Sequence, residues 1–235
     1  MPDNDYAFDS RWEVPGLVAD VAEVLFDPMT LPEWWPSVYR TVDRVDGSPP
    51  DAPPAVGSAY DLHTTGWLPY TLRWRLTVES VGRDTCSLTA SGDLVGRGVW
   101  RLRQLTPTST EVRFDWRVRA DKPLLRNLST LVKPVFAANH QWAMRQGDRS
   151  LRLAIARRSA TLNGDVAALA AIPAPPPPTG AREAALLAAG ALVAIVPVAW
   201  LFSRRAHVRA GLPAHPHLTA GAHPRRPGGA GTRVG

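Results

Sequence analysis

Residues 99–120 read VWRLRQLTPTSTEVRFDWRVRA, and this stretch decides the fold. On both sides of Thr106-Pro107, large apolar side chains alternate with polar or charged ones. A period of two residues is typical of a strand with one buried face, and a turn between two such runs predicts an antiparallel hairpin. We therefore expect strands at 99–105 and 111–120, with their aromatic rings on the buried face.

The same alternation recurs upstream, with turn residues between the runs. The other expected strands are 6–14, 38–45, 56–65, 70–81 and 85–94. From residue 38 onward the connections are too short for crossover helices, so successive strands should pair as antiparallel neighbours. Gly96-Arg97-Gly98 lies between two runs and is interpreted as a turn.

Helical periodicity appears in three places. Apolar residues recur at helical spacing over 17–25, and a second short helical piece covers 31–35. A long apolar stripe runs over 124–158, where Pro134 should bend the helix or divide it. This order predicts an α+β fold for residues 1–160, in which a seven-stranded curved antiparallel sheet wraps around a long C-terminal helix.

Charge and composition exclude several classes of function. The net charge is +6, but residues 204–235 hold six Arg and no acidic residue, so the rest of the chain is formally neutral. Nucleic-acid binding needs a basic face to neutralise phosphates, so we expect no nucleic-acid partner. A single Cys excludes an intramolecular disulfide. Because no metal-ligand cluster, Walker loop or dinucleotide fingerprint appears, we expect no metal and no cofactor.

The chain beyond residue 160 has a different composition. Residues 161–181 are rich in Ala and Pro and are expected to form a linker that is stiff where the prolines cluster. Residues 184–202 carry no charge and are long enough to span a bilayer, so 182–203 is a candidate transmembrane helix. An amphipathic or collapsed appendage is the alternative. Residues 204–235 are expected to be a disordered basic tail.

The membrane orientation follows from two opposing signals. The acidic start is not followed by an apolar stretch, which indicates no signal peptide and a cytoplasmic folded domain anchored through residues 184–202. The Arg-rich tail favours the opposite orientation under the positive-inside rule. We give the missing export signal more weight, because moving a folded domain costs more than moving a short tail.

Three segments carry a resemblance to a known family. They are Pro32-Glu33-Trp34-Trp35-Pro36, the run TEVRFDW at 110–116, and the region from PLLR at 123–126 to NHQWAMRQG at 139–147. In this order they resemble the START-like helix-grip superfamily (SRPBCC), nearest to its polyketide cyclase/dehydrase and lipid transport branch. The likeness covers about residues 6–158. It implies an apolar cavity between sheet and helix for lipids, polyketides or other hydrophobic ligands, without deciding between binder and enzyme.

Strand alternation indicates a cavity wall independently of the family, because several Trp and Tyr side chains share the inner face of the sheet. Solid packing of these rings into a core is the alternative. The expected ligand-binding residues are Trp34, Tyr60, Trp74, Trp100, Trp116, His140 and Met144.

His140 is the candidate catalytic residue, because helical spacing places it with Phe136 and Met144 on the apolar face. Its imidazole could bind a ligand carbonyl or phenol, or act as general acid or base in a cyclisation or dehydration. A structural histidine held by a backbone carbonyl or by Asn139 is the alternative. The sequence thus predicts binding, or transport, of a hydrophobic small molecule, with a polyketide cyclase/dehydratase-type enzyme as the alternative.

Overall fold

The computed structural model describes residues 5–68, 70–120 and 129–179. All of them fall within one compact unit.

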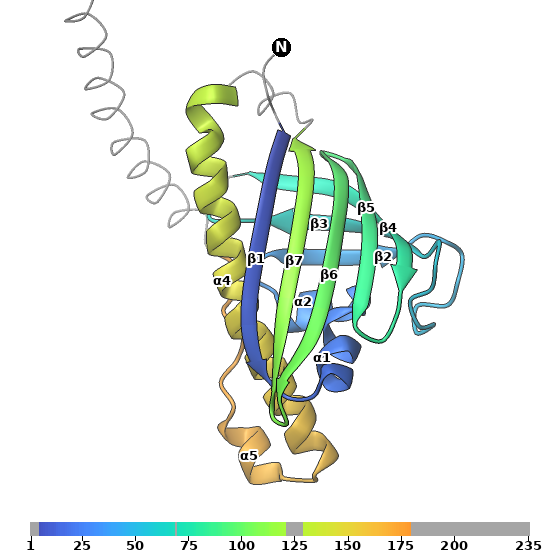
Figure 1. The fold of residues 1–235 in the computed structure, drawn as a ribbon, viewed down its shortest axis with the longest axis vertical. Coiled ribbons are helices and arrows are strands. Elements are labelled where there is room, and N and C mark those ends of the chain that lie inside the picture. Colours follow the sequence, from blue (N-terminus) through green and yellow to red (C-terminus); the bar gives the residue numbers. More distant parts are fainter. Residues whose placement is uncertain (1–4, 69, 121–128, 180–235) are drawn as a thin grey trace, which may run out of the picture. The chain divides into compact units, whose positions relative to one another are not determined.

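Seven antiparallel strands form one sheet in the order β1-β7-β6-β5-β4-β3-β2 (Figure 1). The strands are β1 Asp5–Pro15, β2 Tyr39–Arg44, β3 Ala59–Thr65, β4 Thr71–Val81, β5 Thr85–Gly92, β6 Leu94–Thr106 and β7 Ser109–Ala120. Neighbours from β2 to β7 are consecutive in sequence, and β1 pairs with β7. The predicted seven-stranded antiparallel sheet is confirmed.

The described α-helices lie where periodicity indicates, except the last, which lies in the expected linker. They are α1 Val18–Leu25, a 3₁₀ turn η1 Pro28–Thr30, α2 Leu31–Trp34, α4 Ser129–Leu162 and α5 Val166–Ala171. Helix α4 contacts β1, α1 and α2, and Figure 1 shows it running alongside β1. Pro134 lies inside α4 rather than dividing it. The sheet and long helix together form the predicted α+β helix-grip arrangement.

The inner face of the sheet forms the core, as the alternation predicts. Its buried side chains include Leu62, Trp74, Leu76, Trp100, Leu102, Val112, Phe114, Trp116 and Val118. The opposite face is polar, with one buried carboxylate, Glu111, that is 2% exposed. Burial alone would raise the pKa of Glu111, but hydrogen bonds from Arg113 and Arg103 and the charges of Arg103 and Arg11 outweigh it and lower the pKa.

The turn predicted at Gly96-Arg97-Gly98 is wrong, because these residues lie inside β6. Gly96 pairs with Val118 and Gly98 with Trp116 of β7. A Cβ atom on Gly98 would lie 2.8 Å from Cε3 of Trp116 and 2.9 Å from Cε2 of Phe114. The glycine therefore leaves room on the inner face for two aromatic rings.

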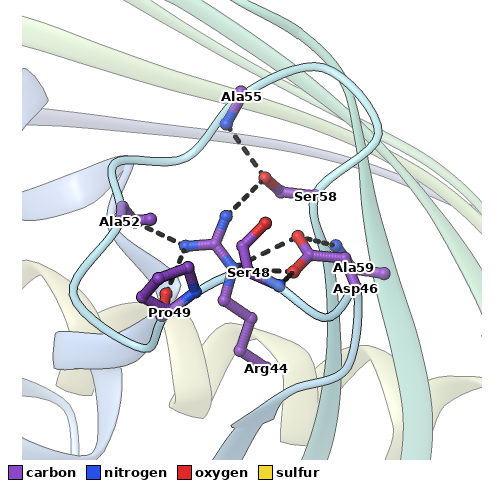
Figure 2. A network of polar contacts seen from close by, with 8 residues as sticks. All are labelled: Arg44, Asp46, Ser48, Pro49, Ala52, Ala55, Ser58 and Ala59. Carbon is purple, nitrogen blue, oxygen red and sulfur yellow. Dashed lines mark hydrogen bonds and ion pairs between the residues drawn. The ribbon is translucent and has the colours of Figure 1, made fainter.

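The loop between β2 and β3 is organised around Arg44, whose side chain is 4% exposed (Figure 2). Its guanidinium donates to Asp46 Oδ1 at 3.0 Å, to Ser58 Oγ at 2.9 Å and to the carbonyl of Ala52. It also lies 5.4 Å from the centroid of the Tyr60 ring. The hydrogen bonds from Arg44 and the Ser48 amide hold the pKa of Asp46 far below its usual range. This network fixes the Pro-rich loop at the start of β3.

The predicted linker begins with structure of its own. Helix α5 starts after Asp165, whose carboxylate accepts a hydrogen bond from the Ala168 amide at 2.9 Å. The Arg157 guanidinium donates to the carbonyl of Pro173 and holds the proline-rich segment against α4. The candidate transmembrane helix at 182–203 and the tail at 204–235 lie outside the described residues. Within the ranges described, no helix has the length and apolar character to cross a bilayer.

Candidate ligand-binding site

A cavity of about 180 Å³ lies between the inner face of the sheet and α4. Strands β1 and β3 to β7, the α1–α2 region, the start of β2 and α4 all contribute to its wall. Among the described residues that line it, none carries a charged side chain. Apolar and aromatic groups make most of the wall, and a few neutral polar groups interrupt it.

Stacked rings form the wall on the side of β6 and β7. The Trp100 and Phe114 rings are stacked with centroids 3.9 Å apart, and Phe114 and Trp116 are 5.4 Å apart at an interplanar angle of 21°. Trp74 of β4 packs against Trp116 with centroids 5.9 Å apart, and its Nε1 donates to Thr64 Oγ1 at 3.1 Å. The stack lies over Gly98, so its rings approach the β6 backbone closely.

His140 lies on the cavity side of α4, in the orientation that helical spacing predicts. Its ring stacks on Phe8 with centroids 3.9 Å apart, and its Nε2 lies 3.5 Å from Ser10 Oγ. Burial lowers the pKa of His140 to about 4, so the imidazole is neutral at pH 7. A neutral imidazole can accept or donate a hydrogen bond. General acid catalysis by His140 would require the imidazolium form, which is scarce at pH 7.

The Asn139 side chain binds the β3–β4 connection and does not bind the neighbouring His140. Its Oδ1 accepts a hydrogen bond from the Trp67 amide at 3.1 Å. A Cβ atom on Gly66 would overlap that oxygen, so the glycine lets the amide group approach. The described contacts of His140 are with Phe8 and Ser10, not with Asn139.

Two phenols and a thiol on the wall stay in their neutral forms at pH 7. Burial raises the pKa of Tyr39, and burial together with the neighbouring Tyr6 raises the pKa of Tyr70. Burial also raises the pKa of the Cys86 thiol to about 11. These groups therefore add hydrogen-bonding capacity without adding charge.

The structure brings five of the seven predicted binding residues to this cavity: Trp74, Trp100, Trp116, His140 and Met144. Trp34 and Tyr60 do not line it, which corrects their predicted placement. Trp34 lies in a separate groove with α1 and the loop residues 51–54, and its neighbour Trp35 lines the cavity instead. Tyr60 does face inward, but it is fully buried beside Arg44 at the far end of β3.

Several wall residues were not among the predicted binding residues, including Tyr6, Phe8, Tyr39, Tyr70 and Phe136. Alternation along β1 places Tyr6 and Phe8 on the inner face, and Phe136 precedes His140 by one helical turn, so both signals were present in the sequence. Tyr39 is the first residue of β2 and Tyr70 directly precedes β4. At such positions alternation alone does not tell whether a side chain reaches the cavity.

Comparison with solved structures finds chains that are similar in fold. The aromatase/cyclase Zhui from Streptomyces sp. R1128 has a TM-score of 0.51 and 15% identity, over 66% of this chain and 96% of that chain. StfQ, the di-domain aromatase/cyclase of the steffimycin pathway, has a TM-score of 0.46 and 19% identity, over 68% and 53% of the two chains. Norcoclaurine synthase from Thalictrum flavum has a TM-score of 0.44 and 15% identity, over 64% and 87%. No protein-family model and no curated protein sequence matches this chain. At these identities the likeness is one of fold.

Proposed function

Since the chain has the helix-grip fold of the START-like superfamily, we propose that it binds a neutral, largely apolar small molecule in the cavity under α4. The observation that carries this proposal is a wall of rings and aliphatic groups with no charged side chain among its described residues. A charged ligand would find no charged partner among the described wall residues, and burying an unpaired charge costs several kcal/mol.

The size of the cavity limits the ligand. The cavity volume of about 180 Å³ is close to the roughly 150 Å³ of an engineered apolar cavity that binds benzene. A single aromatic ring with small substituents therefore fits without rearrangement. A larger ligand requires the wall to move.

Two probes of equal shape and different charge test this function. Neutral 4-nitrotoluene and anionic 4-nitrobenzoate both quench tryptophan fluorescence, and Trp35, Trp74, Trp100 and Trp116 line the cavity. We expect saturable quenching by 4-nitrotoluene and at least about 100-fold weaker binding of 4-nitrobenzoate, because tenfold in affinity is about 1.4 kcal/mol. Trp34→Phe, outside the cavity, serves as the control and should leave the affinity unchanged. Equal binding of both probes, or no saturable binding, would refute the proposal.

Native mass spectrometry of the purified full chain then addresses the natural ligand. A neutral apolar mass that co-purifies and is displaced by 4-nitrotoluene would identify the compound class. A co-purified ligand that 4-nitrotoluene leaves in place would show that binding occurs elsewhere on the protein.

The position of His140 supports a second proposal, a cyclase or dehydratase acting on a polyketide-like substrate. The imidazole lines the cavity in its neutral form and is available as a base, while the buried phenols can donate hydrogen bonds to a developing enolate. His140→Ala separates the two functions when aromatic polyketide-like substrates are offered. Loss of turnover with retained binding supports the enzyme, and unchanged binding and turnover assign His140 a structural role.

We also propose that residues 184–202 anchor the chain in a membrane with the folded domain on the cytoplasmic side. The support is the uncharged stretch in the sequence. Membrane fractionation of the full chain and of a chain ending at residue 181 tests the anchor, and protection of the domain from added protease tests the side. Equal partition of both chains into the soluble fraction would refute it.

A further inference from the structure

The cavity is more accessible at one end than at the other. Wall residues that keep partial exposure gather where β1, β4 and β6 start, where β3 ends and around Phe136–Ala143 of α4. The wall beside α1 and α2 is buried, with Leu25, Leu31 and Trp35 each at most 6% exposed. A ligand that reaches the cavity from solvent therefore meets the first end.

A chain of aromatic rings lines this accessible end, and we name it the aromatic collar: Tyr6, Phe8, Tyr70, Phe136 and His140. The Tyr70 and Phe136 ring centroids are 5.8 Å apart, and Phe136 and Tyr6 are 5.6 Å apart. The chain continues from Tyr6 to Phe8 at 5.9 Å and from Phe8 to His140 at 3.9 Å. Rings offer flat, apolar contact surfaces, so the collar suits the passage of a flat neutral molecule.

The Asn139 side chain bridges α4 and the β3–β4 connection, which carry the two sides of the aromatic collar. We call the junction between these two elements the seam. Tyr70 belongs to the β3–β4 connection, whereas Phe136 and His140 belong to α4. The Asn139 side chain accepts the Trp67 amide at 3.1 Å and thereby ties that connection to α4 across 72 residues of sequence. Trp67 and Leu68 are 7% and 8% exposed, so the tied segment is packed rather than loose.

We propose that the ligand enters and leaves through the aromatic collar, and that Asn139 is a positioning residue whose hydrogen bond to Trp67 must break during exchange. The proposal rests on the proposed ligand binding, and it adds the route of the ligand and the hydrogen bond that controls its passage. The hydrogen bond holds the seam closed in both the free and the bound protein. Its loss should therefore change the rates of exchange more than the affinity.

Stopped-flow quenching with 4-nitrotoluene measures these rates on the full chain. Asn139→Ala should raise the association and dissociation rate constants together, by about threefold to tenfold, as expected for one net hydrogen bond. The dissociation constant should change by less than about threefold, since both rates move in the same direction. Gln141→Ala, exposed on the same helix and outside the cavity wall, is the matched control and should leave both rates unchanged. Rates of Asn139→Ala equal to those of the parent protein would overturn the assignment of Asn139.

A cross-link tests the route itself. The Cβ position of Gly66 lies 2.8 Å from Asn139 Cγ, so cysteines at both positions are close enough for a disulfide. In the oxidised double variant, 4-nitrotoluene loaded before oxidation should be retained on dilution and released when dithiothreitol is added. Release as fast as in the reduced variant would overturn the collar route. This failure is distinct from failure of the proposed function, in which the parent protein binds no 4-nitrotoluene at all.

Discussion

Replacement of Gly98 by Ala should both destabilise the protein and weaken ligand binding. Gly98 is buried on the inner face of β6, directly beneath the rings of Phe114 and Trp116. The added methyl group would lie 2.8 Å from Trp116 Cε3 and 2.9 Å from Phe114 Cε2. Carbon atoms in contact prefer at least about 3.5 Å, so the rings must shift by about 0.7 Å away from the sheet.

The direction of that shift leads into the cavity, because both rings already line it. Inserting a methyl group into a packed core costs about 1–3 kcal/mol, which we expect as a loss in the free energy of unfolding. A displaced stack also narrows a cavity of only about 180 Å³. We expect the affinity for 4-nitrotoluene to fall by about tenfold, equivalent to about 1.4 kcal/mol.

Urea unfolding and tryptophan quenching measure the two effects on the same samples. Gly82→Ala is the matched control, because its Cβ would lie 3.6 Å from its nearest neighbour, the Thr85 carbonyl oxygen, in ordinary contact. Adding Phe114→Leu to Gly98→Ala should recover part of the lost affinity, since the smaller side chain can yield space. A Gly98→Ala protein with parent stability and affinity would show that the rings are not held against the β6 backbone as described.

Three further predictions concern other parts of the wall and the fold. Gly147→Ala should lower both stability and 4-nitrotoluene affinity, because its Cβ would overlap the ring of Trp35, which lines the cavity; parent-like unfolding would contradict this. His140 is kept neutral with its pKa lowered to about 4, so its contribution to stability is present above the unfolded pKa of about 6.5 and is lost as the pH falls toward 4. Between pH 7 and pH 4.5, the unfolding free energy of His140→Gln should decrease by about 2–3 kcal/mol less than that of the parent protein. An equal decrease in the variant and the parent would count against a buried imidazole. Because the pKa of Asp46 is lowered, Asp46→Asn should destabilise the protein at pH 7 and destabilise it less near pH 3. A difference in unfolding free energy between variant and parent that does not change with pH would show that the ion pair with Arg44 is not the cause.

The sequence predicts the fold well because sheet and helix periodicities are local properties. Alternation along 99–120 identifies the rings that face inward, and helical spacing along α4 orients His140 toward them. The hairpins that join these strands follow from the short connections between them. The order of the elements and the inner face of the sheet can therefore be predicted from the sequence before any long-range contact is known.

The details that the sequence misses depend on neighbours distant in the chain. In the sequence, Gly98 is interpreted as part of a turn. Its place inside β6 is explained only by the rings of β7 that pack over it. Trp34 and Trp35 are adjacent, and which of them lines the cavity depends on how a four-residue helix is oriented against α4. Tyr60 is fully buried beside Arg44 of the β2–β3 loop network, a contact that alternation along β3 does not reveal.

The most direct test of an uncharged cavity beneath α4 is a crystal structure of the protein soaked with 4-bromotoluene. Bromine provides an anomalous signal, and the compound is neutral with a single ring. The structure predicts a bromine peak between α4 and the inner face of the sheet, in contact with the stack of Trp100, Phe114 and Trp116. Rings packed solidly through this space, with no bromine peak between sheet and helix, would contradict it.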